Sequence, residues 1–218
     1  VASSATDGFG FHGRYARVAI DAQGYAHVTH QGGNGSDRHF YSTNRPESGT
    51  GAPLWSTELV KLASIGERAI VVASDGLVHV AYKESGGVLT LATRAPLTGE
   101  WSYVTVDGSG RAYDPDLAMG PDGSLHTVTT DYSGGGKGLR YSTNAGGAWQ
   151  TEDVDVGAAN WAPALAIDPL GRAHIASQEA WGGGLTYTTN AGDAWTSTLI
   201  DADTGNSPCF SSIALDAA

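Results

Sequence analysis

The stretch Asp168-Pro169-Leu170-Gly171-Arg172-Ala173-His174 recurs four times in this chain in varied form. Each copy has a turn glycine followed three residues later by a histidine, and the copies are Asp21–His27, Ser74–His79, Pro121–His126 and Asp168–His174. The histidines are separated by 52, 47 and 48 residues. The tryptophans at 55, 101, 149 and 195 keep the same step, with separations of 46, 48 and 46 residues. One structural unit is therefore repeated along the chain.

Short segments of β-branched and aromatic residues surround each repeat and predict four strands, a to d, in every unit. Strand a is expected at Ala16–Asp21 and Ala164–Asp168, strand b at Ala26–Thr29 and Val78–Tyr82, strand c at Phe40–Ser42, Leu89–Leu91, Leu139–Tyr141 and Leu185–Tyr187, and strand d at Gln150–Val154 and Thr196–Ile200. With no segment of helical length, this pattern predicts an all-β protein, a β-propeller of four-stranded antiparallel blades. The blades are expected at about residues 16–67, 68–114, 115–162 and 163–210.

Both ends of the chain read as parts of further blades. Val1–Asp7 aligns with a strand d, and Ser212–Asp216 aligns with a fifth strand a, so residues 1–7 and 211–218 are expected to be stubs. We therefore expect either a single propeller domain completed by another chain, as in a homo-oligomer, or part of a longer propeller, because open blade edges invite pairing.

Composition excludes several classes of partner. The 31 glycines are spread over the turns, and 12 basic residues against 23 acidic ones give a net charge of −11. Such a charge disfavours nucleic acid and anionic membranes, and no apolar run is long enough to span a bilayer. The single cysteine, Cys209, can form no intrachain disulfide. The chain begins as a mature or trimmed product would, and we expect it to be secreted.

The hairpins between strands c and d resemble the Asp-box, or BNR, repeat of sialidase-like propellers. Ser142-Thr-Asn144-Ala-Gly146-Gly-Ala-Trp149 and Thr188-Thr-Asn190-Ala-Gly192-Asp-Ala-Trp195 match Ser/Thr-x-Asp-x-Gly-x-x-Trp with Asn in place of Asp. Ser42-Thr-Asn44 before Trp55 carries an insertion, and Thr93-Arg94 before Trp101 is a decayed copy. We expect Asn to bond its own turn, Gly to take the positive φ and Trp to close the hairpin. The motif implies a scaffold and no catalysis.

A sialidase-like glycoside hydrolase is the alternative that this resemblance raises. Such an enzyme has an arginine triad, an Arg-Ile-Pro segment and a Tyr/Glu nucleophile pair, but Arg-Ile-Pro is absent here, and Asn44-Arg45-Pro46 belongs to a c–d hairpin on the opposite face. A carboxylate pair drawn from Asp114, Asp116 and Asp131 leaves ordinary glycoside hydrolysis open. The repeat histidines suggest no metal, because blade symmetry separates them beyond ligand distances; we expect each to bond the backbone of a neighbouring blade, and we expect no cofactor.

Two tryptophans lie outside the repeat, and functional residues are local whereas scaffold residues recur. Trp161 is expected in a loop from strand d to strand a, and Trp181 in the next loop from strand b to strand c. These two kinds of loop share one face of a propeller, so we expect the two indoles to be neighbours.

Loops of the same face carry polar and aromatic groups that suit a sugar, whose C–H face stacks on aromatic rings and whose hydroxyls form hydrogen bonds. The expected ligand-binding residues are Trp161, Trp181, Tyr113, Asp114, Asn160, Glu179, Asp131 and Arg111. The loops of this face also carry Tyr132 and Lys137, with Phe9, Phe11, His12 and Arg14 in the first d–a loop. We interpret the chain as a non-catalytic, lectin-like module that binds carbohydrate or glycoconjugates. The alternatives are a glycoside hydrolase fragment and a structural or protein-interaction propeller in which each Trp only covers a loop.

Overall fold

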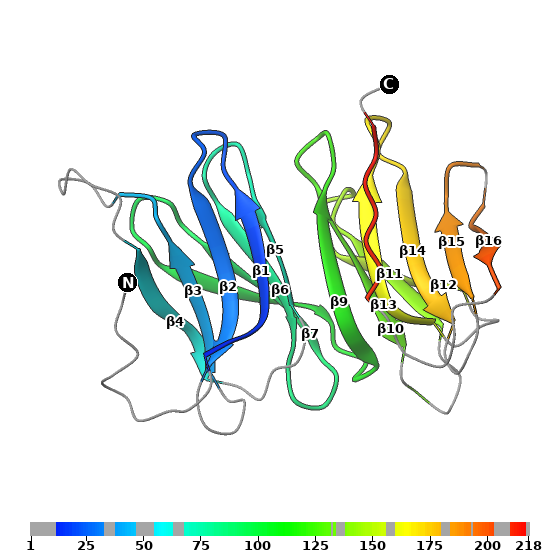
Figure 1. Cartoon of the computed structure of the whole chain (residues 1–218), viewed down its shortest axis with the longest axis horizontal. Coiled ribbons are helices and arrows are strands. Elements are labelled where there is room, and N and C mark those ends of the chain that lie inside the picture. The colour runs from blue at the N-terminus through cyan, green and yellow to red at the C-terminus, as the bar shows by residue number, and fades with distance from the viewer. Residues whose placement is uncertain are drawn as a thin grey trace. The chain divides into compact units, whose positions relative to one another are not determined.

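The structure is a computed structural model, and it describes residues 12–32, 38–46, 55–62, 68–131, 133, 138–155, 160–179, 184–192, 194–202 and 210–216. These residues form sixteen strands in four sheets, and each sheet has its strands in chain order (Figure 1). Within the described ranges, no helix of a length and hydropathy suited to crossing a membrane is found. The predicted all-β fold of four-stranded antiparallel sheets is confirmed.

The four sheets have similar strand lengths, except that β5 has 5 residues where β1 has 9 and β9 and β13 have 8. The first contains β1 (His12–Ile20), β2 (Ala26–Gly32), β3 (Arg38–Thr43) and β4 (Ser56–Leu62), and the second contains β5 (Arg68–Val72), β6 (Val78–Lys83), β7 (Leu89–Arg94) and β8 (Trp101–Asp107). The third contains β9 (Ala112–Met119), β10 (Leu125–Asp131), β11 (Leu139–Thr143) and β12 (Gln150–Asp155), and the fourth contains β13 (Asn160–Ile167), β14 (Ala173–Glu179), β15 (Leu185–Thr189) and β16 (Thr196–Asp201).

The turn glycine of each repeat closes the hairpin between the first two strands of its sheet, as predicted. Gly24, Gly76, Gly123 and Gly171 have φ of 85°, 86°, 82° and 80°, a region that side-chain-bearing residues enter at a cost. Each donates its N–H to the residue three positions earlier, for example Gly171 to the Asp168 carbonyl at 2.9 Å. The glycine is therefore required by the backbone of the turn.

The chain forms two compact units. Unit 1 comprises residues 1–85 and 90–104, and unit 2 comprises residues 86–89 and 105–218. Each unit has its own core between two sheets. In unit 1 the core contains Tyr41, Val60, Ile70, Val78, Val80, Tyr82 and Ala92. In unit 2 it contains Val128, Leu139, Tyr141, Leu165, Ala173 and Ile175.

A repeat tryptophan joins the two sheets within each unit. In unit 1 the Trp101 ring meets Tyr41 edge-on at 5.6 Å, and its Nε1 donates to Glu58 Oε1 at 2.9 Å. In unit 2 Trp195 makes the same contacts, with Tyr141 at 5.1 Å and with Glu152 Oε1 at 3.0 Å. The tryptophan thus binds the preceding sheet, whereas the sequence predicted that it closes its own hairpin. A large amphipathic ring at a sheet edge gains more contact by covering the neighbouring sheet.

The other two roles predicted for the c–d hairpin are also corrected. The Asn side chain bonds strand b of its sheet and not its own turn: Asn44 Oδ1 accepts from Ala26 N, Asn144 from Leu125 N and Asn190 from Ala173 N, each at 2.7 Å. The positive φ, 96°, belongs to Gly147 and not to Gly146. The Asn oxygen accepts the N–H at the start of strand b because that N–H lies beyond the last backbone pair of the ladder and needs an acceptor.

Strand a begins earlier than the sequence pattern indicated. β9 begins at Ala112 and β13 at Asn160, so Tyr113, Asp114, Asn160 and Trp161 lie on strands and not in d–a loops. The alternation was lost there because each of these strands contains a bulge. Residues 210–216 form no strand, contrary to the expectation for Ser212–Asp216, because no described strand pairs with them. Val1–Asp7 lies outside the described residues.

Candidate ligand site

A β-bulge at the first strand of a sheet occurs three times in the described residues. Its marks are a register shift in β1, β9 and β13 and a residue other than glycine at positive φ: Tyr15 at 50°, Asp114 at 46° and Ala162 at 44°. Such backbone strain costs about 1–3 kcal/mol and concentrates at functional sites, where a bulge redirects side chains. In unit 2 the second and third of these bulges occupy equivalent positions on β9 and β13.

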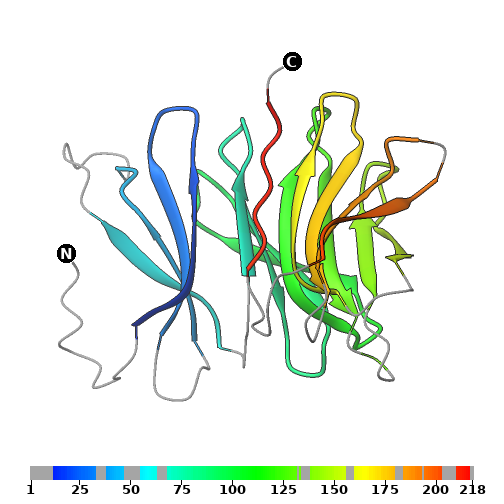
Figure 2. The ribbon, with the colours of Figure 1, turned by 45° about the vertical axis from the view of Figure 1, so that its right-hand side comes forward.

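Strands β9 and β13 lie side by side within unit 2, as Figures 1 and 2 show in green and yellow. One side chain ties them together, because Asp116 Oδ2 accepts the backbone N–H of Leu165 at 2.8 Å. Asp116 follows Asp114 by two residues, and Leu165 follows Ala162 by three. The two bulges are therefore held at the same end of neighbouring strands.

The pairing of these strands places seven of the eight predicted binding residues at this end of unit 2. In the third sheet, Tyr113 pairs with Thr130 and Ala112 with Asp131, so Arg111, Tyr113, Asp114 and Asp131 gather there. In the fourth sheet, Asn160 pairs with Glu179 and Trp161 with Gln178. Trp161 and Glu179 are half-buried. The eighth residue, Trp181, lies outside the described residues, as do Tyr132, Lys137, Phe9 and Phe11. His12 and Arg14 were predicted in a d–a loop, but they begin β1 of unit 1 and so do not belong to this end of unit 2.

Asn160 differs from the role predicted for it. Its side chain is 0% exposed, and its Oδ1 accepts the hydroxyl of Ser177 at 3.0 Å. A side chain without surface cannot contact a sugar, so Asn160 supports the base of the strand pair.

A chain of opposite charges borders the bulge on β9. Arg111 binds Asp131 through two nitrogens, donates from Nε to Ser133 Oγ at 3.0 Å and lies 3.7 Å from Asp153. Arg140, the other arginine of the cluster, binds Asp153 and donates from Nε to Asp107 Oδ2 at 2.9 Å. The two guanidinium groups thus link three carboxylates and order this edge of the sheet.

The charge cluster lowers the pKa of two of its carboxyl groups, Asp131 and Asp107. Burial opposes the ionisation of Asp131, but hydrogen bonds from Arg111 and from the Ser133 N–H outweigh it and hold the pKa below its ordinary value. The same balance lowers the pKa of Asp107, where Ser109 and Arg140 oppose burial. These groups are hydrogen-bond acceptors at neutral pH and carry no proton to donate.

The sequence pattern did not identify three residues of this cluster, Arg140, Asp107 and Asp153. Arg140 stands on strand c at the position that Thr90 occupies in the previous repeat and Thr186 in the next one, and that departure was the available signal. Asp153 falls within the segment predicted as strand d, Gln150–Val154, for which the sequence indicated no functional role. Its partners become visible only when β11 and β12 are paired, with Arg140 opposite Asp153.

The repeat histidines are structural, although their partners differ from those expected. Nδ1 of His27, His126 and His174 lies 2.5–2.6 Å from the hydroxyl of Tyr41, Tyr141 or Tyr187 on the adjacent strand. Nε2 of His27 lies 3.2 Å from Asp21 Oδ2. These are side chains of the same sheet, and not the backbone of a neighbouring blade. No cluster of three or more metal-ligating side chains occurs among the described residues.

Burial of the histidines predicts sensitivity to mild acid. Burial is the largest cause that lowers the pKa of His27, His79 and His126 below 6.5. As pH falls through 6.5, the unfolded chain takes up protons that the folded chain does not, so stability is lost on acidification. We expect the thermal midpoint to drop between pH 7.5 and pH 5, above the range in which the carboxyl groups titrate. An unchanged or rising midpoint over this interval would contradict the role assigned to the histidines.

The comparisons with known proteins agree on the fold. No protein-family profile matches the sequence, and no curated protein matches it. Among solved structures, a fungal fucose-recognising lectin from Aleuria aurantia with a six-bladed β-propeller aligns at 13% identity and a TM-score of 0.65, over 88% of this chain and 64% of the lectin. The Hadza microbial sialidase Hz136 aligns at 15% identity and 0.61, over 91% of this chain and 48% of the sialidase.

A third similar structure is the α-L-arabinofuranosidase Arb93A from Fusarium graminearum. It aligns at 12% identity and a TM-score of 0.58, over 89% of this chain and 65% of the enzyme. The chain thus spans about half to two thirds of the length of these three proteins. At such identities the likeness concerns the fold, which is that of β-propeller blades.

Proposed function

We propose that this chain is a non-catalytic, lectin-like module that binds carbohydrate at the bulged end of β9 and β13. The observation that carries the proposal is the placement of Trp161 and Tyr113 at equivalent bulge positions of two adjacent strands. Aromatic side chains on neighbouring strands can stack on the C–H face of a sugar ring. The Asp131 carboxylate and the Arg111 guanidinium supply an acceptor and donors for hydroxyl groups.

The composition of the site favours binding over hydrolysis. A glycosidase needs one carboxyl group with a raised pKa that serves as the acid. In the described part of the chain, the carboxyl groups with a resolved pKa shift all have it lowered: Asp21, Glu84, Asp107, Asp122, Asp131 and Asp168. Asp116, one member of the suggested catalytic pair, is committed to the Leu165 N–H. The similar structures include both lectins and glycosidases, so activity must be measured.

Two assays separate the proposal from its alternatives. The full chain is applied to immobilised glycans and, in parallel, to aryl glycosides of the same sugars. Retention on glycans without release of the aryl group supports a lectin-like module. Release of the aryl group identifies a hydrolase. If the chain neither binds glycans nor releases the aryl group, a structural or protein-interaction propeller is the remaining alternative.

Replacing the off-repeat tryptophan tests the site itself. We expect Trp161→Ala to weaken binding of a retained glycan by about 2 kcal/mol, roughly 30-fold in Kd, because a stacking surface is removed. Calorimetric titration measures the change. Trp55→Ala is the control, since Trp55 belongs to unit 1 and is 44% exposed. Equal affinities for wild type and Trp161→Ala would count against the site.

We also propose that the module is secreted and that further blades complete it, from another copy or from the remainder of a longer propeller. The tryptophan of the first sheet supports the presence of a further blade. Trp55 is the counterpart of Trp101 and Trp195, which pack against a tyrosine of the preceding sheet, yet it is 44% exposed. A preceding blade would supply those contacts.

A further inference from the structure

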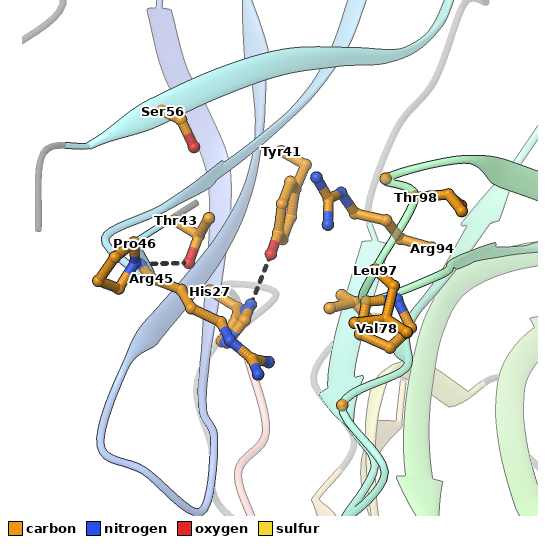
Figure 3. Close-up of a pocket in the computed structure, with 13 residues that line it drawn as sticks. His27, Tyr41, Thr43, Arg45, Pro46, Ser56, Val78, Arg94, Leu97 and Thr98 are labelled. Carbon is orange, nitrogen blue, oxygen red and sulfur yellow. Dashed lines mark hydrogen bonds between the residues drawn. The ribbon is translucent and has the colours of Figure 1, made fainter. Parts of the chain in front are cut away.

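A cleft of about 380 Å³ opens between the first two sheets, within unit 1. It lies at the end of the sheets that bears their a–b and c–d turns. The c–d hairpins of both sheets and the a–b turn at Gly76 line it (Figure 3). It therefore belongs to a different unit from the bulge site. The function proposed above makes no use of it.

Two arginines line this cleft, and both depart from the repeat. Arg45 stands where the later hairpins have Ala145 and Ala191, and Arg94 stands where the other three have Asn. No aspartate or glutamate is among the described residues that line the cleft, in a chain whose net charge is −11. Since scaffold positions recur and functional ones are local, these arginines indicate a built site for a negative group.

Arg45 is placed to bind a ligand. Its backbone N–H is fixed by Thr43 Oγ1 at 3.1 Å, and its guanidinium points into the cleft in Figure 3. The side chain is 37% exposed, and Nη1 lies 3.8 Å from Asp21 Oδ2, beyond hydrogen-bond distance. An added Cβ at Gly76 would lie 3.2 Å from the same Nη1, so the guanidinium rests against the glycine turn of the second sheet.

Arg94 forms a more rigid part of the same wall. Its Nε donates to Glu58 Oε1 at 2.5 Å and its Nη2 to Oε2 at 3.5 Å, while the guanidinium lies over the Tyr41 ring at 5.3 Å. These bonds engage two of its three nitrogens with described partners. Among the described residues, no hydrogen-bond acceptor is found for Nη1.

The charges around the cleft favour a ligand with a single negative charge. Asp21 and Glu58 lie behind the two arginines and offset part of their charge. A dianion such as phosphate would then exceed the positive charge on offer, whereas one carboxylate would match a single free guanidinium edge in the fork geometry that arginine prefers.

The remaining walls suit a ring with hydroxyls. Val78, Pro96 and Leu97 form an apolar side, and Leu97 is 96% exposed. Thr43, Ser56 and Thr98 bring hydroxyl groups to the same cleft. A volume of about 380 Å³ admits one monosaccharide. We propose that this cleft binds the carboxylate of an acidic monosaccharide, a uronic acid, with Arg45 as the principal ligand residue.

The test is calorimetric titration of the full chain at low ionic strength with D-glucuronate, D-glucose and inorganic phosphate. Wild-type protein is expected to bind glucuronate saturably and more tightly than phosphate, and to bind glucose at least tenfold more weakly than glucuronate. Arg45→Gln should weaken glucuronate binding at least tenfold, and Arg45→Lys should restore only part of it, because lysine lacks the planar fork. Arg172→Gln, in unit 2 and with a side chain 42% exposed, is the matched control and should bind as wild type does.

The outcomes are separable from those of the bulge site. Thermal unfolding checks that Arg45→Gln is folded, and Trp161→Ala should retain full glucuronate affinity because it alters the other unit. The proposal is overturned if glucuronate does not bind, if glucose or phosphate binds as tightly, or if folded Arg45→Gln binds as wild type does. None of these results would affect glycan binding at β9 and β13.

Discussion

Trp101→Ala is expected to lower the free energy of unfolding by about 3 kcal/mol, the range for deleting a large ring from a packed position. The indole covers the Tyr41 ring and joins the core of unit 1, and its N–H satisfies Glu58, which also binds Arg94. Removing it leaves a void and takes one hydrogen bond from a partly buried carboxylate. Trp195→Ala should behave alike, since it loses Tyr141 and Glu152. Urea denaturation measures both.

Trp55→Ala is the matched control for this prediction. Trp55 occupies the same repeat position but is 44% exposed in the single chain, so its loss from the monomeric chain should cost less than about 1 kcal/mol. Similar losses at Trp55 and Trp101 would mean that the contacts with the preceding sheet do not stabilise the fold.

Gly87→Ala is expected to be the second strongly destabilising change, with a loss of about 3 kcal/mol or more from strain and overpacking combined. A Cβ at Gly87 would lie 2.3 Å from the carbonyl oxygen of Gly110 and 2.6 Å from its carbon, both backbone atoms. The same Gly87 accepts the Ala112 N–H at 2.9 Å, so relieving the clash would break the bond that starts β9. The β9 bulge lies two residues beyond Ala112.

Gly86→Ala separates the clash from the backbone conformation. Its φ of 81° is close to the 78° of Gly87, but a Cβ there would meet nothing within 4 Å. Its loss should therefore be only the strain of a left-handed alanine, about 1 kcal/mol. Thermal unfolding of the two variants compares them directly. Equal midpoints would show that the approach of Gly87 to Gly110 is not a constraint on the fold.

The repeat made the fold predictable because its residues act within one sheet. The turn glycines at 24, 76, 123 and 171 need positive φ wherever they stand, and the alternation around His27 or His174 marks a strand by itself. Contacts between sheets could not be read in this way. Trp101 meets Glu58 across 43 positions. The cluster of Arg111 and Arg140 with their three carboxylates spans five strands or their ends, β8 to β12. Such pairs depend on how neighbouring sheets and strands pack.

Residues of the candidate site could be predicted where a side chain departs from the repeat. They could not be predicted where the backbone departs from regular strand geometry. Trp161 was identified because it lies outside the repeat, and its placement at the same end as Tyr113 and Asp131 follows from topology. The bulges at Asp114 and Ala162 disrupted the two-residue period, so strands were interpreted as loops. The sequence indicated only that Arg45 belongs to a c–d hairpin, because its cleft exists only when two sheets face each other.

The most direct test of carbohydrate binding at the bulged strands is an NMR titration that follows the indole N–H signals of the six tryptophans. A glycan retained in the binding assay is added to ¹⁵N-labelled protein, with Trp161→Ala used to assign the Trp161 signal. Binding at the bulged strands predicts a saturable shift of the Trp161 signal, while the signals of Trp55 and Trp101, in unit 1, stay in place. A glycan that binds and shifts Trp55 or Trp101 but leaves Trp161 unmoved would contradict it.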